Sequence, residues 1–533
     1  MPLTVATALG AGIWIGNRFV NSTFNDSSSD KIGTIMGLIE SDYVDDVDID
    51  SLIEASIPDI LSKLDPHTSY IPSESLQSVN EELEGSFCGI GIQFNMLTDT
   101  IKVLEVISGG PSEKVGLLPG DRIITINDSL AAGQKWPQEK VLKTLRGERD
   151  TKVKLGIQRS NSPELFTYEV TRGEIPVTSI DASYLMNDSI GYIKVNKFGR
   201  TTYSEFLNSL VDLKSKGATK YMIDLRSNTG GFMEMAILMA NEFLPTGQPI
   251  VATHGRTSYS ETSVGSDGSG SFQNEDIIVL LDEYSASASE IFAGAIQDND
   301  RGLIVGRRSF GKGLVQRQIE LSDSSAIRLT TGRYYTPSGR CIQKEYTRGA
   351  IDAYDNEINS RYQHGEGFSR DSVKLDTTQT YHTLGGRPVY GGGGIMPDIY
   401  VPNDTTGLTS YYIKVLNAGL LHKFAFDFAD ANRDQLKEAK SADELISLLP
   451  NEDSLLYSFA TYANANGNIA PRWYYINISR NLIVNLLKAL IARDILGSSE
   501  YYKVLNQSDT TIDRALQEFN EGNAKYPIAV TDN

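Results

Sequence analysis

The sequence of 533 residues has few of the side chains that bind metals or cross-link chains. Its two cysteines, Cys88 and Cys341, are far apart, so they indicate neither a disulfide framework nor a cysteine-based metal site. Its five histidines are scattered, and none forms a HExxH or similar metal-binding pair. The sequence therefore predicts no metal and no other cofactor.

An excess of basic residues is also absent, because the formal net charge is −19. A nucleic-acid groove needs a basic face, so we expect no nucleic-acid partner, although charge alone leaves room for a local basic patch. The composition, 40% hydrophobic and 22% charged, is ordinary for a soluble globular protein. The length exceeds what one core usually holds and predicts two to four domains.

The N-terminal apolar run, residues 2–16, is shorter than the roughly 20 residues that span a bilayer, and no Lys or Arg precedes it. It could be a short signal peptide, the core of an anchor, or an apolar strand. Its position and composition favour an export signal or anchor. We therefore expect an exported protein of the cell envelope or periplasm, with membrane association through the N-terminus left open.

Residue patterns divide the chain into five segments. After the signal-like segment come a helical stretch, a stretch of short strands with glycine turns, a stretch that alternates buried strands with helices, and a second helical stretch. The predicted boundaries are 1–29, 30–83, 84–173, 174–405 and 406–533. The expected fold class is multidomain α/β plus β, in which the β unit is a small, partly open barrel. The last segment has no catalytic signature, so we interpret it as a helical appendage or a homo-oligomer contact.

The α/β stretch contains short apolar runs at 221–225, 277–281 and 302–306, which predict strands buried on both faces. Helical patterns at 233–244 and 289–298 follow the first two. Residues 257–271 and 344–382 are polar and loop-rich.

One turn of this unit has the composition of a nucleophile site. Residues 276–298 predict a strand, a tight turn with three alternating serines, and a helix. A serine in such a turn lies at a helix N-terminus, where free N–H groups favour developing negative charge. The GxSxG pattern of other hydrolases is absent, and no histidine is nearby to act as base.

Lys312 is the local candidate for that base. A lysine accepts a proton only when its pKa is lowered, and burial has this effect. The neighbours Phe310, Leu314 and Val315 are apolar, and Gln316 could orient the amine through its side-chain carbonyl. Ser–Lys pairs are a known variant of the nucleophile and base, but the spacing alone also suits a helix-cap serine and a surface lysine.

The residues SASASEIFAGAIQD and GRRSFGKGLVQ together resemble the active-site signature of the C-terminal processing peptidases, or tail-specific proteases. Further blocks resemble that family in the same order, among them LDPHTSY, DLRSNTGG, YYTPSGRCIQ and GGGGIMPDIYVP. The resemblance covers most of residues 30–405 and implies a crotonase-like serine peptidase core. It implies Ser287 as nucleophile, Lys312 as general base and Gln316 as the residue that orients the lysine.

The same resemblance implies an oxyanion hole in which Ala288 supplies one N–H donor and Gly230 or Gly231 the other. The family often has an acid at the position of Asp298. In this chain Asp298 is either a supporting residue of the site or a solvated carboxylate at the helix end. The histidine of LDPHTSY, His67, is interpreted as structural, because a Ser–Lys pair needs no imidazole.

Residues 84–173 resemble a PDZ domain, a fold that adds the C-terminal tail of a partner to an open sheet edge. The loop and edge strand would be residues 89–94, in which Gly89 and Gly91 permit close approach. Ile90, Ile92, Val141 and Leu145 would line an apolar pocket, or else belong to the ordinary core.

Together these features predict a serine endopeptidase that grips protein or peptide substrates by accessible apolar C-termini and cleaves them through an acyl-enzyme. One alternative is a catalytically inactive PDZ scaffold or binding protein. Another is an acyl-CoA enzyme of crotonase-like fold with carboxylate acid–base residues.

Overall fold

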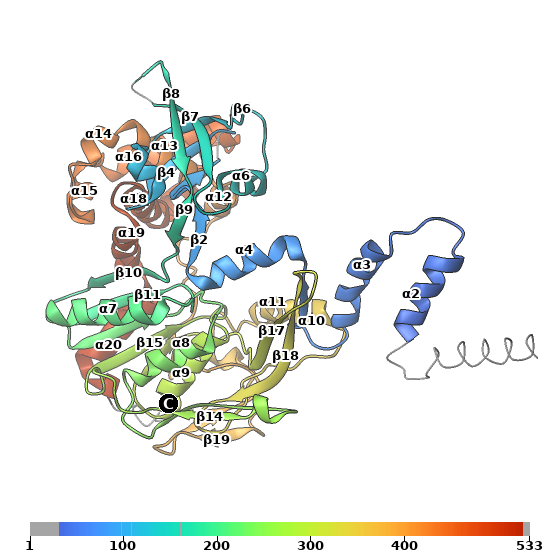
Figure 1. Cartoon of the computed structure of the whole chain (residues 1–533). Helices are drawn as coiled ribbons and strands as arrows, with labels where there is room; N and C mark the ends of the chain where they lie inside the picture. Colours follow the sequence, from blue (N-terminus) through green and yellow to red (C-terminus); the bar gives the residue numbers. More distant parts are fainter. Residues whose placement is uncertain (1–30, 97–98, 108, 160–161, 526–533) are drawn as a thin grey trace, which may run out of the picture.

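The computed structural model describes residues 31–525 except 97–98, 108 and 160–161. The segment interpreted above as an export signal or anchor lies outside the described residues. Among the residues that are described, no helix is both long and apolar enough to cross a membrane. Figure 1 shows the helices α2 (Lys31–Asp42) and α3 (Ile49–Leu61) projecting from the body of the molecule, and α4 (Ser73–Glu84) leading back to it.

The centre of the α/β unit is a six-stranded sheet. Its strands, in spatial order, are β10 (Ile180–Leu185), β11 (Ile190–Val195), β12 (Lys220–Asp224), β15 (Asp276–Leu281), β16 (Leu303–Gly306) and β21 (Ile399–Tyr400). All neighbours are parallel except β10, which is antiparallel to β11. The three predicted apolar strands are therefore confirmed as β12, β15 and β16, adjacent and parallel.

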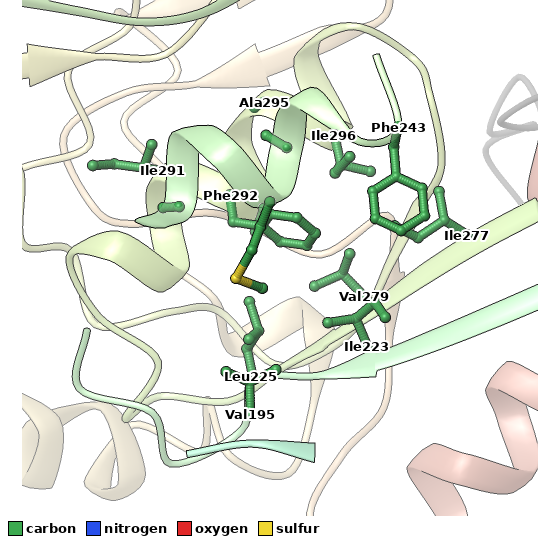
Figure 2. Close-up of a cluster of buried hydrophobic side chains, with 14 of the residues drawn as sticks. Val195, Ile223, Leu225, Phe243, Ile277, Val279, Ile291, Phe292, Ala295 and Ile296 are labelled. Atoms are coloured by element: carbon green, nitrogen blue, oxygen red, sulfur yellow. The ribbon is translucent and has the colours of Figure 1, made fainter. Parts of the chain in front are cut away.

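Helices cover both faces of this sheet, which is why its strands are apolar on both sides. On one face lie α7 (Thr202–Ser215), α8 (Met233–Asn241) and α9 (Ala288–Asp298), and Figure 2 shows side chains of α9 packed on β12 and β15. On the other face, Ile278 and Leu280 pack against Ile512 and Phe519 of α20 (Thr510–Glu521). The C-terminal region is thus more than an appendage, because its last long helix completes the layered core.

A second sheet carries Gln316 of the predicted site, and Lys312 lies in the loop that leads into it. This sheet comprises β1 (Ser69–Ile71), β18 (Ala326–Tyr335), β13 (Pro249–Gly255) and β14 (Thr262–Gly265), with β17 (Leu314–Glu320) also paired to β18. Two stretches expected to be loop-rich contain regular structure. The first holds β14, and the second holds α10 (Ile351–Asp355), α11 (Glu357–Gln363) and β19 (Thr380–His382), which pairs with β20 (Pro388–Tyr390).

The β-rich unit is built around a sheet with its own buried core. The sheet runs β3 (Ile92–Asn95), β4 (Ile101–Val106), β5 (Arg122–Ile126), β7 (Lys152–Gln158) and β8 (Leu165–Thr171), with β6 (Ser129–Leu130) paired to β5. Two helices accompany it, α5 (Pro111–Val115) and α6 (Gln138–Leu145). The expected edge strand at 89–94 starts at Ile92 as β3, whereas the residues before the loop form β2 (Ser86–Gly89), which pairs with β9 (Gly173–Pro176).

The C-terminal helices form a separate hydrophobic cluster beside this unit. They are α12 (Ser410–Asn417), α13 (Leu420–Ala431), α14 (Arg433–Leu436), α15 (Ala442–Leu448), α16 (Glu452–Gly467), α17 (Trp473–Ile478), α18 (Arg480–Leu496) and α19 (Ser498–Leu505). Asp430 of α13 pairs with Arg122 of β5 at 3.4 Å and lies 3.9 Å from Lys102 of β4. The helical region therefore contacts the β-rich unit through α13 and the α/β core through α20.

Candidate active site

Ser287 lies where the predicted strand–turn–helix placed it, at the N-cap of α9. Its backbone has φ 56° and ψ −113°, a conformation that residues with a Cβ rarely adopt and that costs about 1–3 kcal/mol. Its N–H donates to Glu290 Oε2 at 2.9 Å, which helps to hold this strained turn. The side chain is partly exposed, whereas the neighbouring Ala286 and Ala288 are buried.

A buried carboxylate, Glu290, joins this turn to the Lys312 loop. Its two oxygens accept hydrogen bonds from the N–H groups of Ser287, Gly311 and Lys312 at 2.8–2.9 Å, and from Ser309 Oγ at 2.5 Å. Burial raises the pKa of Glu290 to about 7, and the four donors oppose that rise. Sequence reasoning missed this residue, although the S-x-x-E spacing of a capping box begins at Ser287.

Tyr334 adds a second link between the two segments. Its hydroxyl lies within hydrogen-bond distance of the carbonyl oxygens of Ser287, at 3.2 Å, and of Lys312. The ring is buried, so the contact is shielded from water. The backbones of Ser287 and Lys312 are thus joined on one side by a carboxylate and on the other by a phenol.

Gln316 holds the amine of Lys312. Lys312 Nζ donates to Gln316 Oε1 at 2.9 Å, and Gln316 Nε2 donates to the carbonyl oxygen of His67. Because a carbonyl only accepts, His67 fixes which way the Gln316 amide points and leaves its oxygen facing the amine. Burial lowers the pKa of Lys312, and the charge of Arg328 lowers it further.

His67 itself stays neutral at physiological pH. Burial and the nearby Lys312 lower its pKa to about 4, and its Nε2 pairs with the Tyr354 hydroxyl at 2.8 Å. Its contribution to the site comes from the backbone carbonyl and not from the imidazole, in agreement with its interpretation as structural.

Five of the predicted site residues, Gly230, Gly231, Ser287, Lys312 and Gln316, line one cavity of about 470 Å³. It is lined by Val79, Thr229, Gly230, Gly231, Phe232, Met233, Ser287, Ile291, Lys312, Leu314, Val315, Gln316, Gln318, Arg328 and Tyr334. No hydrogen bond joins the side chains of Ser287 and Lys312 in the described structure, where the amine points to Gln316 instead. In the part of the chain that is described, no three His, Cys, Asp or Glu residues are grouped so that they could hold a metal ion.

The glycine loop that follows β12 lies directly against the Ser287 turn. A Cβ added at Gly230, whose φ is +104°, would be 2.7 Å from Ser287 Cβ and 3.0 Å from the Ala288 nitrogen. The Gly230 N–H donates to Asn228 Oδ1 at 2.9 Å, whereas the N–H groups of Gly231 and Ala288 donate to no residue that the structure describes. This distinction between the two glycines was invisible in the sequence.

Asp298 lies at the other end of α9 and does not line the cavity. It is fully buried, pairs with Arg340 at 2.7 Å and accepts a hydrogen bond from Ser338 Oγ at 2.7 Å. Its contacts therefore fix the 336–340 loop, and it is not the solvated carboxylate that was one of its two interpretations.

The residues expected to bind a substrate tail lie around β3, which is an edge strand of its sheet. Gly91 has φ +75°, and a Cβ there would be 3.0 Å from Ile175 Cδ1, so this loop needs glycine. Ile90, Val141 and Leu145 belong to the buried core of the β-rich unit, whereas Ile92 is partly buried at its margin. A Cβ at Gly89 would meet the Phe87 ring at 2.9 Å.

Comparison with known families assigns the two main units. Residues 189–352 match the model of "Peptidase family S41", and residues 88–170 match that of a PDZ domain. Residues 411–497 match a family of unknown function.

Individual relatives agree with this assignment. The chain is 36% identical over 317 residues to a carboxy-terminal-processing protease of Bartonella bacilliformis, covering 59% of this chain and 72% of the relative. It is 31% identical over 342 residues to a probable CtpA-like serine protease of Staphylococcus aureus, covering 64% and 68%. Among solved structures, the photosystem II D1 C-terminal processing protease is 26% identical with a TM-score of 0.32, covering 58% of this chain and 88% of that one. The chain therefore belongs to the carboxy-terminal-processing proteases and is an S41 serine peptidase with a PDZ domain.

Proposed function

We propose that the peptidase uses Ser287 as its nucleophile and Lys312 as its general base. The observation that carries this proposal is the shared cavity, in which a partly buried lysine with a lowered pKa faces the same space as a serine at a helix N-terminus. Burial disfavours the ammonium form, so part of the lysine is neutral and able to accept a proton near neutral pH.

Gln316 would keep that amine in place. Because the His67 carbonyl holds the Gln316 amide in one orientation, the amide oxygen accepts one N–H of Lys312 and leaves the nitrogen lone pair free to turn toward Ser287. The two side chains are not hydrogen-bonded here, and catalytic hydrogen bonds commonly tighten only once substrate is bound. A rotation of the lysine side chain would complete the pair.

The oxyanion donors would be the N–H groups of Gly231 and Ala288. Both are without an acceptor in the described structure, whereas the Gly230 N–H is already bonded to Asn228. In the reaction, Ser287 Oγ would attack the peptide carbonyl carbon as its proton passes to Lys312 Nζ. The protonated lysine would then give that proton to the leaving amine as the C–N bond breaks, and water would hydrolyse the acyl-enzyme by the same route.

Substrates would be selected by their C-terminal tails at the PDZ domain. The support is the free edge of β3 beside the glycine loop at 89–91, a geometry suited to adding a tail as an extra strand and capturing its carboxylate with backbone N–H groups. Apolar last residues would contact Ile92, which is partly buried at the margin of the core of the β-rich unit.

The experiment compares cleavage of one unstructured protein carrying an apolar C-terminus as the free acid and as the amide. We expect the amide to be cleaved at least about tenfold more slowly, through a higher KM, since tail capture needs the carboxylate. Equal rates for the two forms would reject tail selection. The Ser287→Ala and Lys312→Ala variants, assayed on the acid form, test the chemistry separately.

A further inference from the structure

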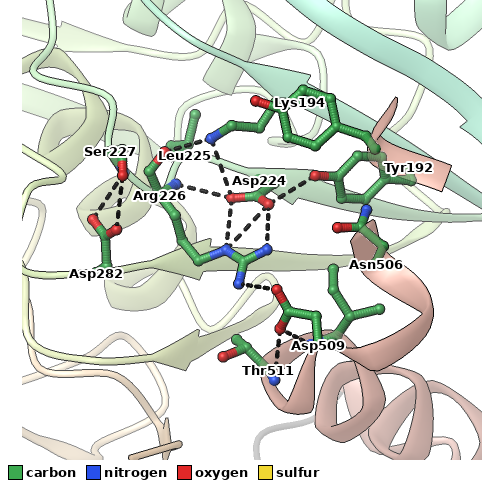
Figure 3. A network of polar contacts seen from close by, with 12 residues as sticks. Tyr192, Lys194, Asp224, Leu225, Arg226, Ser227, Asp282, Asn506, Asp509 and Thr511 are labelled. Atoms are coloured by element: carbon green, nitrogen blue, oxygen red, sulfur yellow. Dashed lines mark hydrogen bonds and ion pairs between the residues drawn. The ribbon is translucent and has the colours of Figure 1, made fainter. Parts of the chain in front are cut away.

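The loop that would supply an oxyanion donor begins at a cluster of four charged groups, shown in Figure 3. We call residues 225–231 the oxyanion loop. The cluster contains Asp224 and Arg226, at the end of β12 and the start of this loop, together with Lys194 of β11 and Asp509 from the C-terminal region. Two cations thus face two carboxylates in a mostly buried environment, and the side chain of Arg226 is 18% exposed.

Every polar group of Arg226, in the side chain and the backbone, makes a hydrogen bond. Its Nη2 donates to Asp224 Oδ2 and its Nη1 to Asp509 Oδ2, each at 2.7 Å, while its backbone N–H donates to Asp224 Oδ1 at 2.9 Å. Its carbonyl oxygen accepts a hydrogen bond from Lys194 Nζ. The side chain and main chain of the residue that starts the oxyanion loop are therefore fixed together.

Asp509 holds its place in this cluster because it also caps α20. Its Oδ1 accepts the N–H groups of Thr511 at 2.9 Å and Ile512 at 3.1 Å, while its Oδ2 accepts from Arg226. The helix that it caps packs Ile512 and Phe519 onto the central sheet. One carboxylate therefore joins a helix fixed on one face of the sheet to the loop at the end of β12.

Only a few residues separate Arg226 from the Gly231 N–H, which has no acceptor among the described residues, and hydrogen bonds fix those residues. The next residue, Ser227, has φ 59°, a left-handed conformation, and its N–H donates to Asp282 Oδ1 at 2.9 Å. Asn228 then accepts the Gly230 N–H, and its carbonyl accepts the Ala286 N–H at 3.0 Å. A tilt at the start of this strained loop would move the donor nitrogens relative to Ser287.

We propose that Asp509, acting through Arg226, positions the oxyanion loop, so that α20 belongs to the catalytic unit of this peptidase. Asp509 touches neither substrate nor reacting atoms and is a positioning residue. Without its charge, Arg226 and Lys194 share the single carboxylate of Asp224, and the guanidinium loses the partner that fixes its outer nitrogen. This inference rests on the proposed function, because it assumes that a donor in this loop stabilises the oxyanion.

The test is Asp509→Asn in the full chain. Asparagine is as good a helix N-cap as aspartate, so the substitution removes the charge and keeps the cap. We expect kcat on an unstructured protein substrate to fall about tenfold with KM within about twofold, since a donor displaced by a fraction of an ångström loses part of its effect. The affinity for a peptide aldehyde, which forms a tetrahedral adduct with the serine, should fall by a similar factor, while the affinity for the corresponding peptide acid stays unchanged.

The matched control is Glu518→Gln on the same helix. Glu518 is buried and pairs with Arg514 at 2.5 Å but has no contact with the oxyanion loop. It should leave kcat and aldehyde affinity unchanged. If both variants lose the same kcat, the effect is general destabilisation and the proposal is overturned. Asp509→Ser, which also keeps a capping oxygen, serves if Asp509→Asn fails to fold.

Two further results separate this proposal from the function on which it rests. Adding Asp509→Asn to Arg226→Met should cost nothing more than Arg226→Met alone, because Asp509 acts only through Arg226; a further loss in kcat would overturn the proposal. If Ser287→Ala keeps wild-type activity, the proposed function fails. If Ser287→Ala is inactive but Asp509→Asn keeps wild-type kcat and aldehyde affinity, only this inference fails.

Discussion

The Ser287 turn and the oxyanion loop are two strand-to-helix turns at the ends of neighbouring parallel strands, β15 and β12. Both contain a non-glycine residue at positive φ, Ser287 at 56° and Ser227 at 59°, so both carry backbone strain. They differ in what holds them. The Ser287 turn is held by Glu290 of its own helix and by Tyr334, whereas the oxyanion loop is held at its start by Asp509, from a helix near the C-terminus.

This difference teaches that the two halves of one site can depend on separate parts of the chain. The backbones of Ser287 and Lys312, the proposed nucleophile and base, are joined by Glu290 and Tyr334 inside the segment that matches the S41 model, residues 189–352. The orientation of Gln316 depends on a contact from outside this segment, the His67 carbonyl. The oxyanion loop lies in that segment too, but one of its fixing charges comes from outside it. We therefore expect changes in the C-terminal region to disturb the geometry of the oxyanion loop more than that of the Ser287 turn and Lys312.

The largest expected effect comes from Lys312→Ala. Loss of the proposed general base should lower kcat by about 10⁴-fold, as for other nucleophile–base pairs, and leave the free energy of unfolding nearly unchanged or raised, since a partly buried amine is removed. The measurement is steady-state cleavage of an unfolded protein together with thermal unfolding.

Lys344→Ala is the matched control, because burial also lowers the pKa of Lys344 and this lysine does not line the same cavity. It should keep kcat within about tenfold of wild type. If Lys312→Ala cleaves the substrate at the wild-type rate, Lys312 is not the general base.

Gly230→Ala tests the contact between the two turns. A Cβ there would lie 2.7 Å from Ser287 Cβ and 2.8 Å from the Ala286 oxygen, so the loop and the turn must separate. We expect kcat to fall about 10²- to 10³-fold, the range seen when one oxyanion donor is lost.

Gly217→Ala is the control, because Gly217 has nearly the same positive φ, +107° against +104° at Gly230. Its new Cβ would meet only the Asp188 backbone oxygen, at 3.3 Å. It should destabilise the fold by about 1 kcal/mol without a change in kcat. If Gly217→Ala loses as much kcat as Gly230→Ala, strain alone explains the effect and the contact between the turns has no special role.

Glu290→Gln weakens the hydrogen bonds that join the Ser287 turn to the Lys312 loop, and it should have a smaller effect on kcat. An amide offers one acceptor where the carboxylate offers two, so its NH₂ group must face N–H or O–H donors on one side. We expect kcat to fall about tenfold and the free energy of unfolding to fall by about 2 kcal/mol near pH 8, where the pKa of about 7 leaves Glu290 mostly ionised.

The pH dependence of that variant gives a second check. Because the pKa of Glu290 rises from an ordinary 4.5 to about 7 on folding, the folded state binds more protons than the unfolded state between these values. The stability that Glu290 gives relative to glutamine should therefore decrease as pH rises from about 4.5 to 7, by up to about 1.4 kcal/mol per unit. A constant difference across this window would contradict a raised pKa.

The smallest expected effect is that of Arg328→Met on the pH–rate profile. The charge of Arg328 lowers the pKa of Lys312, so its removal should raise that pKa and move the rise of kcat/KM with pH to higher pH, by less than about one unit. Arg317→Met, an exposed charge on β17, is the control and should leave the profile unchanged. A shift to lower pH would mean that Lys312 does not act as the base.

Much of the site could be predicted from the sequence because short local patterns indicate the strands and the turn that carry it. The apolar runs of β12 and β15 indicate buried strands, and the small residues around Ser287 indicate a turn before a helix. Glu290 could have been found from its capping-box spacing, and Asp509 could have been recognised as a helix cap. Neither pattern tells which distant group the second carboxylate oxygen meets.

The sequence by itself determined the order of the units, the buried strands, and Lys312 and Gln316 as a candidate base and its orienting residue, because these depend on residues close together in the chain. Ser287 was singled out from three alternating serines by the family resemblance. Only the tertiary structure decided that His67 orients Gln316, that Gly230 but not Gly231 donates its N–H to another described residue, and that Asp509 meets Arg226. These are contacts between segments far apart in sequence, and their geometry is set by packing on both faces of one sheet, which no local pattern encodes.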